Sequence, residues 1–101
     1  MTFKIEDQHD QIDIDRLMAD ERVRKAINES LIELARAERL HPVWPEDVMD
    51  QVNIMFGRAD RADGAATLLA YGQGSIERLR HRIRQTIAMG IRALINLEND
   101  K

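Results

Sequence analysis

Two long stretches of helical periodicity constrain the fold of this chain most strongly. Between residues 48 and 69, and again between residues 76 and 97, apolar side chains recur at steps of three and four. This spacing places the apolar side chains of each stretch on one face of an α-helix. The first stripe is Val48, Val52, Met55, Ala59, Ala62, Ala66 and Leu69, and the second is Ile76, Leu79, Ile83, Ile87, Gly90, Leu94 and Leu97.

Short polar or glycine-containing segments mark the ends of these helices. Gly72 and Gly74 predict a turn, and Ser75 is the expected N-cap of the last helix. A third helix is predicted over residues 21–40, with Asp20 as its N-cap and Pro42 just beyond its end. Its predicted inner face is Val23, Ile27, Leu31, Leu34 and Ala35. We expect Pro45 in the first turn of the helix that follows, because proline suits that position.

The remaining N-terminal part predicts little regular structure. Residues 13–19 fit a short helix, and residues 1–12 lack a clear period and are predicted to be a flexible acidic segment. No stretch has a β pattern. The prediction is therefore an all-α fold, a compact bundle of three main helices with a short N-terminal helix, forming a single domain over residues 13–101.

Composition excludes several classes of protein. The chain of 101 residues has no cysteine, which excludes disulfides, thiolate metal sites and a cysteine nucleophile. No apolar run approaches the roughly 18 to 20 residues of a membrane span, and nothing resembles a signal peptide, so we expect a cytoplasmic protein without a membrane partner.

Charge is distributed unevenly along the chain. The formal net charge is −3, but residues 1–21 carry −5 and residues 76–92 carry +4. The two ends could neutralise each other within one molecule or one dimer, or the acidic end could meet a partner. The arginines of the basic end, at positions 78, 80, 82 and 84, are spread around a helix rather than aligned. With an acidic chain and only 4% aromatic residues, direct nucleic-acid binding is not expected.

The polar residues give no catalytic or metal-binding candidate by themselves. The three histidines, His9, His41 and His81, form no pair at a helical spacing that would bind a metal. Serine and threonine side chains have no neighbouring base. No catalytic residue, metal ligand or cofactor is therefore expected.

Two stretches carry a resemblance to a known family. "HPVWPEDVMDQVNIM" and "IERLRHRIRQTIAMGIRALINL" resemble phage-borne small helical proteins related to the MazG-type nucleotide pyrophosphohydrolases, over about residues 41–97. The resemblance implies an all-α fold, assembly as dimers or larger oligomers, and magnesium-dependent hydrolysis of nucleoside triphosphates. The family uses two groups of carboxylates, because several acidic side chains must converge on Mg²⁺.

This chain departs from the family at the residues that would hold the metal. Aligning on "WPED" places the first acidic motif on Gly57, Arg58 and Arg61, and aligning on "QTIAM" places the second on His81 or Arg82 and on Arg84 or Gln85. No matched position is acidic. The resemblance therefore implies a scaffold without its metal site.

The favoured hypothesis is a non-enzymatic phage-type protein that inhibits a host protein or ribonucleoprotein complex in the bacterial cytoplasm, in the manner of anti-CRISPR proteins. The alternatives are a divergent nucleotide pyrophosphohydrolase and a structural or regulatory helical oligomer. Candidate partner-binding residues are Asp10, Asp13, Asp15, Asp20, Glu21, Arg58 and Arg61. The apolar surface of residues 76–97 is too broad for one neighbour, so a homo-oligomer is expected, with Met89, Ile91 and Ile95 in its interface.

Overall fold

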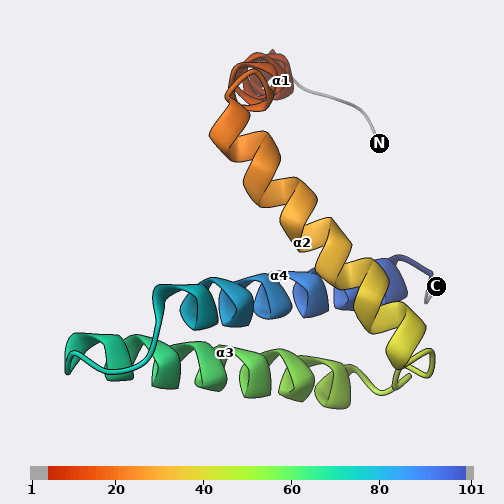
Figure 1. The fold of residues 1–101 in the computed structure, drawn as a ribbon. Coiled ribbons are helices and arrows are strands. Elements are labelled where there is room, and N and C mark those ends of the chain that lie inside the picture. Colours follow the sequence, from red (N-terminus) through yellow and green to blue (C-terminus); the bar gives the residue numbers. More distant parts are fainter. Residues whose placement is uncertain (1–4, 100–101) are drawn as a thin grey trace.

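Every regular element in residues 5–99, the part of the chain that the computed structural model describes, is an α-helix. The helices are α1 (Ile5–Met18), α2 (Glu21–Leu40), α3 (Val48–Ala70) and α4 (Ile76–Asn99) (Figure 1). The predicted all-α fold, with three main helices and a short leading helix, is confirmed. None of the described helices has the length and apolar character needed to cross a bilayer.

Two of the predicted helix caps are confirmed. The carboxylate of Asp20 accepts a hydrogen bond of 2.8 Å from the backbone N–H of Arg22 and begins α2. The hydroxyl of Ser75 accepts one of 3.1 Å from the backbone N–H of Arg78 in the first turn of α4. Each cap satisfies a backbone donor that has no partner inside its own helix.

The start of α3 differs from the prediction. Asp47 is the N-cap, and its carboxylate accepts hydrogen bonds from the backbone N–H groups of Met49 and Asp50 at 2.9 and 3.2 Å. Pro45 therefore lies in the connection before α3 and not in its first turn. The aspartate side chain satisfies two donors at once, which defines the helix start more strongly than proline does.

The N-terminal boundary also needs correction. α1 begins at Ile5 and not at residue 13, so residues 5–12 of the predicted flexible segment are helical, and residues 1–4 lie outside the described part. α1 packs only on α2, and most of it stands away from the other helices (Figure 1). Residues 10–18 of α1 are exposed, and a helix exposed in this way needs no apolar stripe, so periodicity gives a weak signal for α1.

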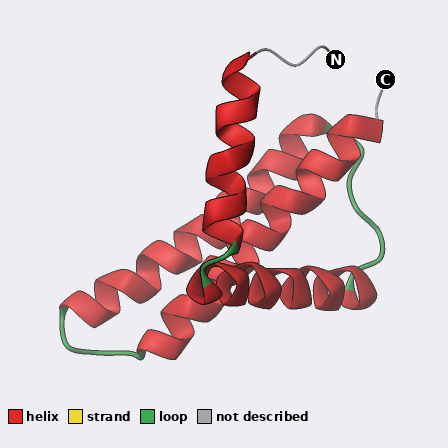
Figure 2. Ribbon diagram, turned by 90° about the horizontal axis from the view of Figure 1, so that it is seen from above, coloured by secondary structure: helices red, strands yellow, loops and turns green. Residues whose placement is uncertain are grey.

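α3 and α4 form an antiparallel hairpin, and α2 crosses it at a steep angle while packing on α4 (Figures 1 and 2). The turn between α3 and α4 has positive φ at Gly72 and Gly74, of 74° and 75°, which glycine adopts without strain. The core centres on Leu34, Ala88 and Met89, where α2 meets α4. Ala88 is 0% exposed, and its small side chain lets the two helices approach closely.

The buried face of α4 is not the predicted stripe. Ala88, Met89, Arg92 and Ala93 are buried. Four members of the predicted stripe lie on the opposite side of α4 and are exposed, namely Ile76, Ile83, Ile87 and Leu94. α4 thus carries two apolar faces, and only one of them is covered within the chain.

A buried arginine fixes the connection between α2 and α3 to α4. The Nη2 of Arg92 donates a hydrogen bond of 2.7 Å to the carbonyl oxygen of His41, at the end of α2. Its guanidinium carbon lies 4.7 Å from the centre of the Trp44 ring. Both contacts are strong for their kind, because the charge is removed from water.

The single chain is more open than its length predicts. Its radius of gyration is 16.3 Å, whereas a compact domain of this length has about 13 Å. Its accessible surface is 8080 Å², against about 5,900 Å² for a compact monomer of this mass. The excess comes with many exposed apolar side chains on all four helices. Such surface is typical of a chain that associates with another.

Leu34 and Ile32, on opposite sides of α2, test this packing. Leu34 is 7% exposed and Ile32 is 68% exposed. We expect Leu34→Ala to lower the free energy of unfolding by about 2 to 4 kcal/mol, because it opens a cavity beside Ala88. Ile32→Ala should lower it by less than about 0.5 kcal/mol. Urea unfolding followed by circular dichroism measures both, and equal losses would contradict the described core.

Candidate functional site

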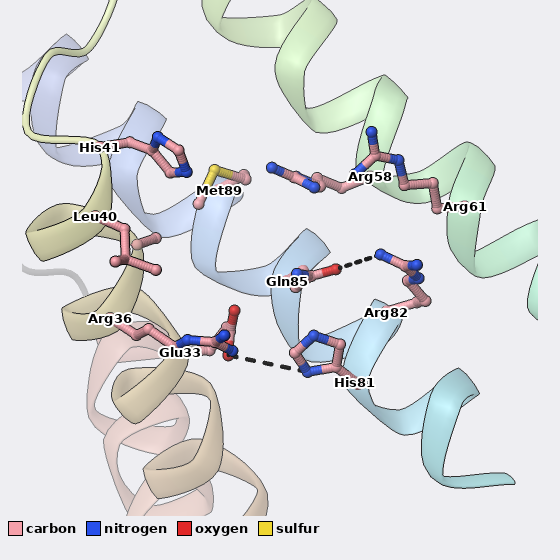
Figure 3. A pocket seen from close by; sticks show the side chains of 11 residues that line it. Glu33, Arg36, Leu40, His41, Arg58, Arg61, His81, Arg82, Gln85 and Met89 are labelled. Atoms are coloured by element: carbon pink, nitrogen blue, oxygen red, sulfur yellow. Dashed lines mark hydrogen bonds and ion pairs between the residues drawn. The ribbon is translucent and has the colours of Figure 1, made fainter.

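A cleft lies where the C-terminal half of α2, the middle of α3 and the middle of α4 meet (Figure 3). Its volume is about 260 Å³. α2 and its end contribute Glu33, Arg36, Ala37, Leu40 and His41; α3 contributes Arg58 and Arg61; α4 contributes His81, Arg82, Gln85 and Met89. We call this the arginine cleft, after Arg36, Arg58, Arg61 and Arg82.

Five of the positions that the sequence resemblance aligned with acidic motifs line this cleft. Arg58 and Arg61 face it from α3, and His81, Arg82 and Gln85 face it from α4 (Figure 3). Helical spacing explains the convergence, because residues three or four apart share one face of a helix. Two stretches identified separately in the sequence thus line one cavity.

Two other positions from the same sequence comparison lie outside the cleft. Gly57 is exposed and does not line it. Arg84 points to a neighbouring hollow, where its guanidinium lies 2.8 Å from the carboxylate of Glu29. Of the alternatives left open for α4, His81, Arg82 and Gln85 are therefore the cleft residues.

The arginine cleft has a large excess of positive charge. Four arginines and one glutamate give a formal charge of +3 with both histidines neutral. Glu33 lies 3.7 Å from Arg36 and 4.0 Å from Nδ1 of His81. Arg82 donates a hydrogen bond of 3.2 Å to Gln85, which is uncharged. Among the side chains of the described residues, no ion pair includes Arg58, Arg61 or Arg82.

Arg58 experiences this excess most directly. Partial burial lowers the pKa of its guanidinium, and the positive charges of Arg61 and Arg82 lower it further. Glu33 acts in the opposite direction but does not cancel these effects. The group stays charged at physiological pH, since an arginine pKa is far above it. Its charge therefore disfavours the folded state.

The chemistry of the cleft suits an anion and opposes a divalent cation. Magnesium needs several oxygen ligands, and here the side chains that point inward are mostly guanidinium donors. Among residues 10–98, whose side chains the structure describes, no group of three or more histidine, aspartate or glutamate side chains is placed to hold a metal ion. Guanidinium groups match the oxygens of phosphate and carboxylate, to which they donate in pairs.

The acidic candidates lie apart from this cleft. Asp10, Asp13 and Asp15 are on the exposed helix α1, and Asp20 and Glu21 are at the start of α2, at its other end (Figure 1). The structure therefore divides the candidate partner-binding residues into an acidic end and the pair Arg58 and Arg61. These two groups do not form one continuous site.

Several acidic side chains already have partners within the chain. Asp13 lies 3.6 Å from Arg16, and Asp15 accepts a hydrogen bond of 3.0 Å from Gln11. Asp20 is occupied most fully, because it caps α2. The Arg22 side chain and backbone N–H lower the pKa of its carboxyl. Asp10 and Glu21 are exposed.

Two of the five arginines in residues 76–92 pair with acids that lie outside the acidic end. Arg80 pairs with Glu77 one turn away on α4, and Arg84 pairs with Glu29 on α2. Within the described residues, no ion pair joins residues 10–21 to residues 76–92. The arginines of residues 76–92 therefore do not neutralise the acidic end, whose described ion pairs are formed with Arg16 and Arg22.

The candidate interface residues of α4 differ in exposure. Met89 is 5% exposed and belongs to the core of the chain, which leaves little of its surface for a partner. Ile91 packs against the same core. Ile95 is exposed, as are Ile87 and Leu94 on the uncovered face.

Sequence reasoning missed the contribution of α2 to the cleft. Glu33, Arg36, Ala37 and Leu40 follow one another at steps of three, one and three, so they share a face of the helix. The prediction used the apolar stripe of α2 instead of this mixed face. Two residues of that stripe, Ile27 and Leu31, are exposed in the structure. The helical spacing of these charged and apolar residues was the available signal.

Comparisons of the chain with protein-family models, with curated proteins and with solved structures found no match. The relation to the MazG-type enzymes therefore stays an expectation from the quoted residues.

Neutralising Arg58 should stabilise the free protein. Arg58→Gln removes a partly buried charge beside Arg61 and Arg82, so we expect the free energy of unfolding to rise by roughly 0.5 kcal/mol at low ionic strength. The gain should shrink in salt, which screens the repulsion. Urea unfolding in a phosphate-free buffer measures it.

Arg39→Gln is the matched control. Arg39 lies in the last turn of α2, outside the cleft, where a positive charge favours the helix. We expect this variant to be no more stable than the natural chain. A loss of stability in Arg58→Gln would show that its charge is already balanced in the free protein.

Proposed function

We propose that this chain is a non-enzymatic binding protein that inhibits a host complex, as phage-borne anti-CRISPR proteins do, on a scaffold related to MazG-type enzymes. The observation that carries the non-enzymatic part is the arginine cleft. Positions that would supply converging carboxylates carry Arg58, Arg61, His81, Arg82 and Gln85 instead.

The electrostatics of the cleft support this part of the proposal. Magnesium-dependent hydrolysis needs carboxylates to balance the ion and orient the triphosphate. Arginine side chains repel the ion, and at separations of a few ångström the repulsion is several kcal/mol at an effective dielectric constant near 20. The single acid of the cleft, Glu33, is shared between Arg36 and His81.

The binding part of the proposal is supported by the exposed acidic end. α1 lies at the end of α2 that is remote from the hairpin, with Asp10, Asp13 and Asp15 on its surface, beside exposed apolar side chains such as Ile12 and Leu17 (Figure 1). Acidic and apolar groups together fit a basic protein surface, such as the nucleic-acid-binding face of a host protein or ribonucleoprotein complex. The choice of an inhibitor rests on the resemblance to phage proteins.

Self-association is the second element of the proposal. The uncovered face of α4, with Ile83, Ile87 and Leu94, lies beside a small apolar hollow of about 140 Å³ between α3 and α4. Phe56 and Val52 line that hollow, and Phe56 is exposed. A second copy placed against this face would bury apolar surface and complete the hydrophobic core of a small chain.

The proposal predicts two results. The purified chain should release no diphosphate from any deoxynucleoside triphosphate in the presence of Mg²⁺ or Mn²⁺, because the cleft lacks converging carboxylates. The immobilised chain should capture a defined host complex, with an association rate that falls steeply as salt is added, because acidic side chains steer the encounter.

Charge reversal provides the control for the binding result. Asp13→Lys with Asp15→Lys should slow association at least about tenfold and leave the helix content unchanged, since both residues are exposed. Hydrolysis that exceeds a heat-treated sample and stops with chelator would falsify the non-enzymatic part. An association rate that is flat up to about 0.5 M salt would remove the acidic end from recognition.

The uncovered face of α4 generates a prediction about assembly. We expect the natural chain to sediment as a dimer or larger oligomer at micromolar concentration and Ile87→Asp to shift it to the monomer, because a charge would be buried unpaired. Ile32→Asp, at a more exposed position on α2, should leave the assembly unchanged. A natural chain that sediments as a monomer would rule out this interface.

A further inference from the structure

We propose that the arginine cleft binds a small, multiply charged oxyanion of the phosphate class, held by Arg58, Arg61 and Arg82 without a metal ion. This inference concerns a ligand of the chain itself and does not depend on the inhibitor role. It explains why arginines, and not neutral residues, line the cleft from which the metal site is proposed to be lost.

The first support is the convergence of the charges. Arg58 and Arg61 come from one turn of α3, and Arg82 comes from the facing side of α4 (Figure 3). Arg36 and His81 add further donors from α2 and α4. An anion inside this space would meet hydrogen-bond donors from three helices and not from a single stretch of surface.

The second support is the contrast with a neighbouring hollow between α2 and α4. That hollow also contains arginines, but Arg80 pairs with Glu77 and Arg84 pairs with Glu29. The chain therefore supplies acidic partners to these arginines. The arginine cleft has one acid for four arginines, so the acids that line it balance only a quarter of its positive charge.

The third support is the environment of Arg58. Partial burial and two positive neighbours disfavour its charge in the empty cleft. A bound anion would reverse this effect, because it would supply hydrogen-bond acceptors and opposite charge at the same place. Residues that disfavour the free protein in this way are typical of a site arranged for a ligand.

Size and charge define the ligand class. A volume of about 260 Å³ is slightly below the usual range of about 300 to 1,000 Å³ for small-molecule sites, so it accommodates a phosphate or diphosphate group and excludes a folded partner. An anion with two or more negative charges would balance the formal charge of +3. Tetrahedral phosphate oxygens accept paired hydrogen bonds from guanidinium groups.

Isothermal titration calorimetry of the full chain with inorganic diphosphate, in buffer containing EDTA and no phosphate, tests the proposal. We expect saturable binding that raises the unfolding temperature of the protein. Arg58→Gln, Arg61→Gln and Arg82→Gln should each weaken the affinity at least about tenfold, because each removes a charged donor. Arg39→Gln, which removes the same charge outside the cleft, should stay within about twofold.

Three further ligands define the class and source of the anion. Citrate tests charge alone, and its affinity should be at least about tenfold lower than that of diphosphate, because its carboxylates are planar and spread apart. A deoxynucleoside triphosphate and a single-stranded oligonucleotide test the source. If the triphosphate binds, the natural ligand is a nucleotide phosphate. If the triphosphate is excluded while diphosphate binds, the ligand is a free anion. Both results support the site.

Four results would overturn the proposal. These are no binding of diphosphate at millimolar concentration, binding that EDTA abolishes, equal weakening by Arg39→Gln, and preferential binding of citrate or of the oligonucleotide. Circular dichroism of each variant separates a lost site from a lost fold. Arg58→Gln is informative here, because it should be at least as stable as the natural chain without the anion and less stabilised with it.

Discussion

The contact of Arg92 with the end of α2 determines how the helices of this protein are arranged. α2 packs on α4 and not on α3, so its crossing angle depends on what holds its C-terminal turn. Arg92 binds the His41 carbonyl and lies over the Trp44 ring, although its position is 51 residues away from His41 in the sequence. A charged donor in a buried place favours one geometry strongly, since few other arrangements satisfy it. Leu34, Ala88 and Met89 then fill the space beside it.

This arrangement leaves two kinds of surface uncovered. On one side, α2 ends over the hairpin and encloses the arginine cleft together with α3 and α4. On the other side, the face of α4 around Ile87 has no neighbour within the chain. One chain of this length cannot cover both faces of α4 with only α2 and α3. The cleft and the apolar face are therefore consequences of the same packing, and they differ in what could occupy them.

The cleft links the proposed loss of hydrolysis with the proposed binding of an anion. Arginines at positions 58, 61 and 82 repel a divalent cation and attract phosphate oxygens for the same electrostatic reason. A scaffold that surrounds a charged ligand needs few substitutions to exchange carboxylates for guanidinium groups, because the cavity and the helices stay in place. The acidic end on α1 lies outside this cleft, so the proposed partner contact and the proposed anion site use different surfaces.

The sequence by itself determined the helices, most of their ends and the positive net charge of residues 76–92. Asp20, Ser75, Gly72 and Gly74 act through neighbouring backbone groups, and local interactions of this kind can be recognised from a single sequence. The sequence resemblance also aligned Arg58 and Arg82 with two acidic motifs of one family. The structure places both side chains in one cleft. Residues 5–12 are helical although they show no apolar period.

Tertiary structure decided which faces are buried. In α4 the longer apolar stripe, around Ile83, Ile87 and Leu94, stays exposed, whereas the buried face is shorter and includes Arg92, so helical spacing alone predicts the wrong face. Ala88 and Arg92 settle the choice, the first by its small size and the second by a hydrogen bond that only the folded chain offers. The contribution of Glu33 and Arg36 to the cleft follows from the crossing of α2 over α4, which depends on contacts between residues far apart in the sequence; helical spacing shows only that the two residues share a face of α2.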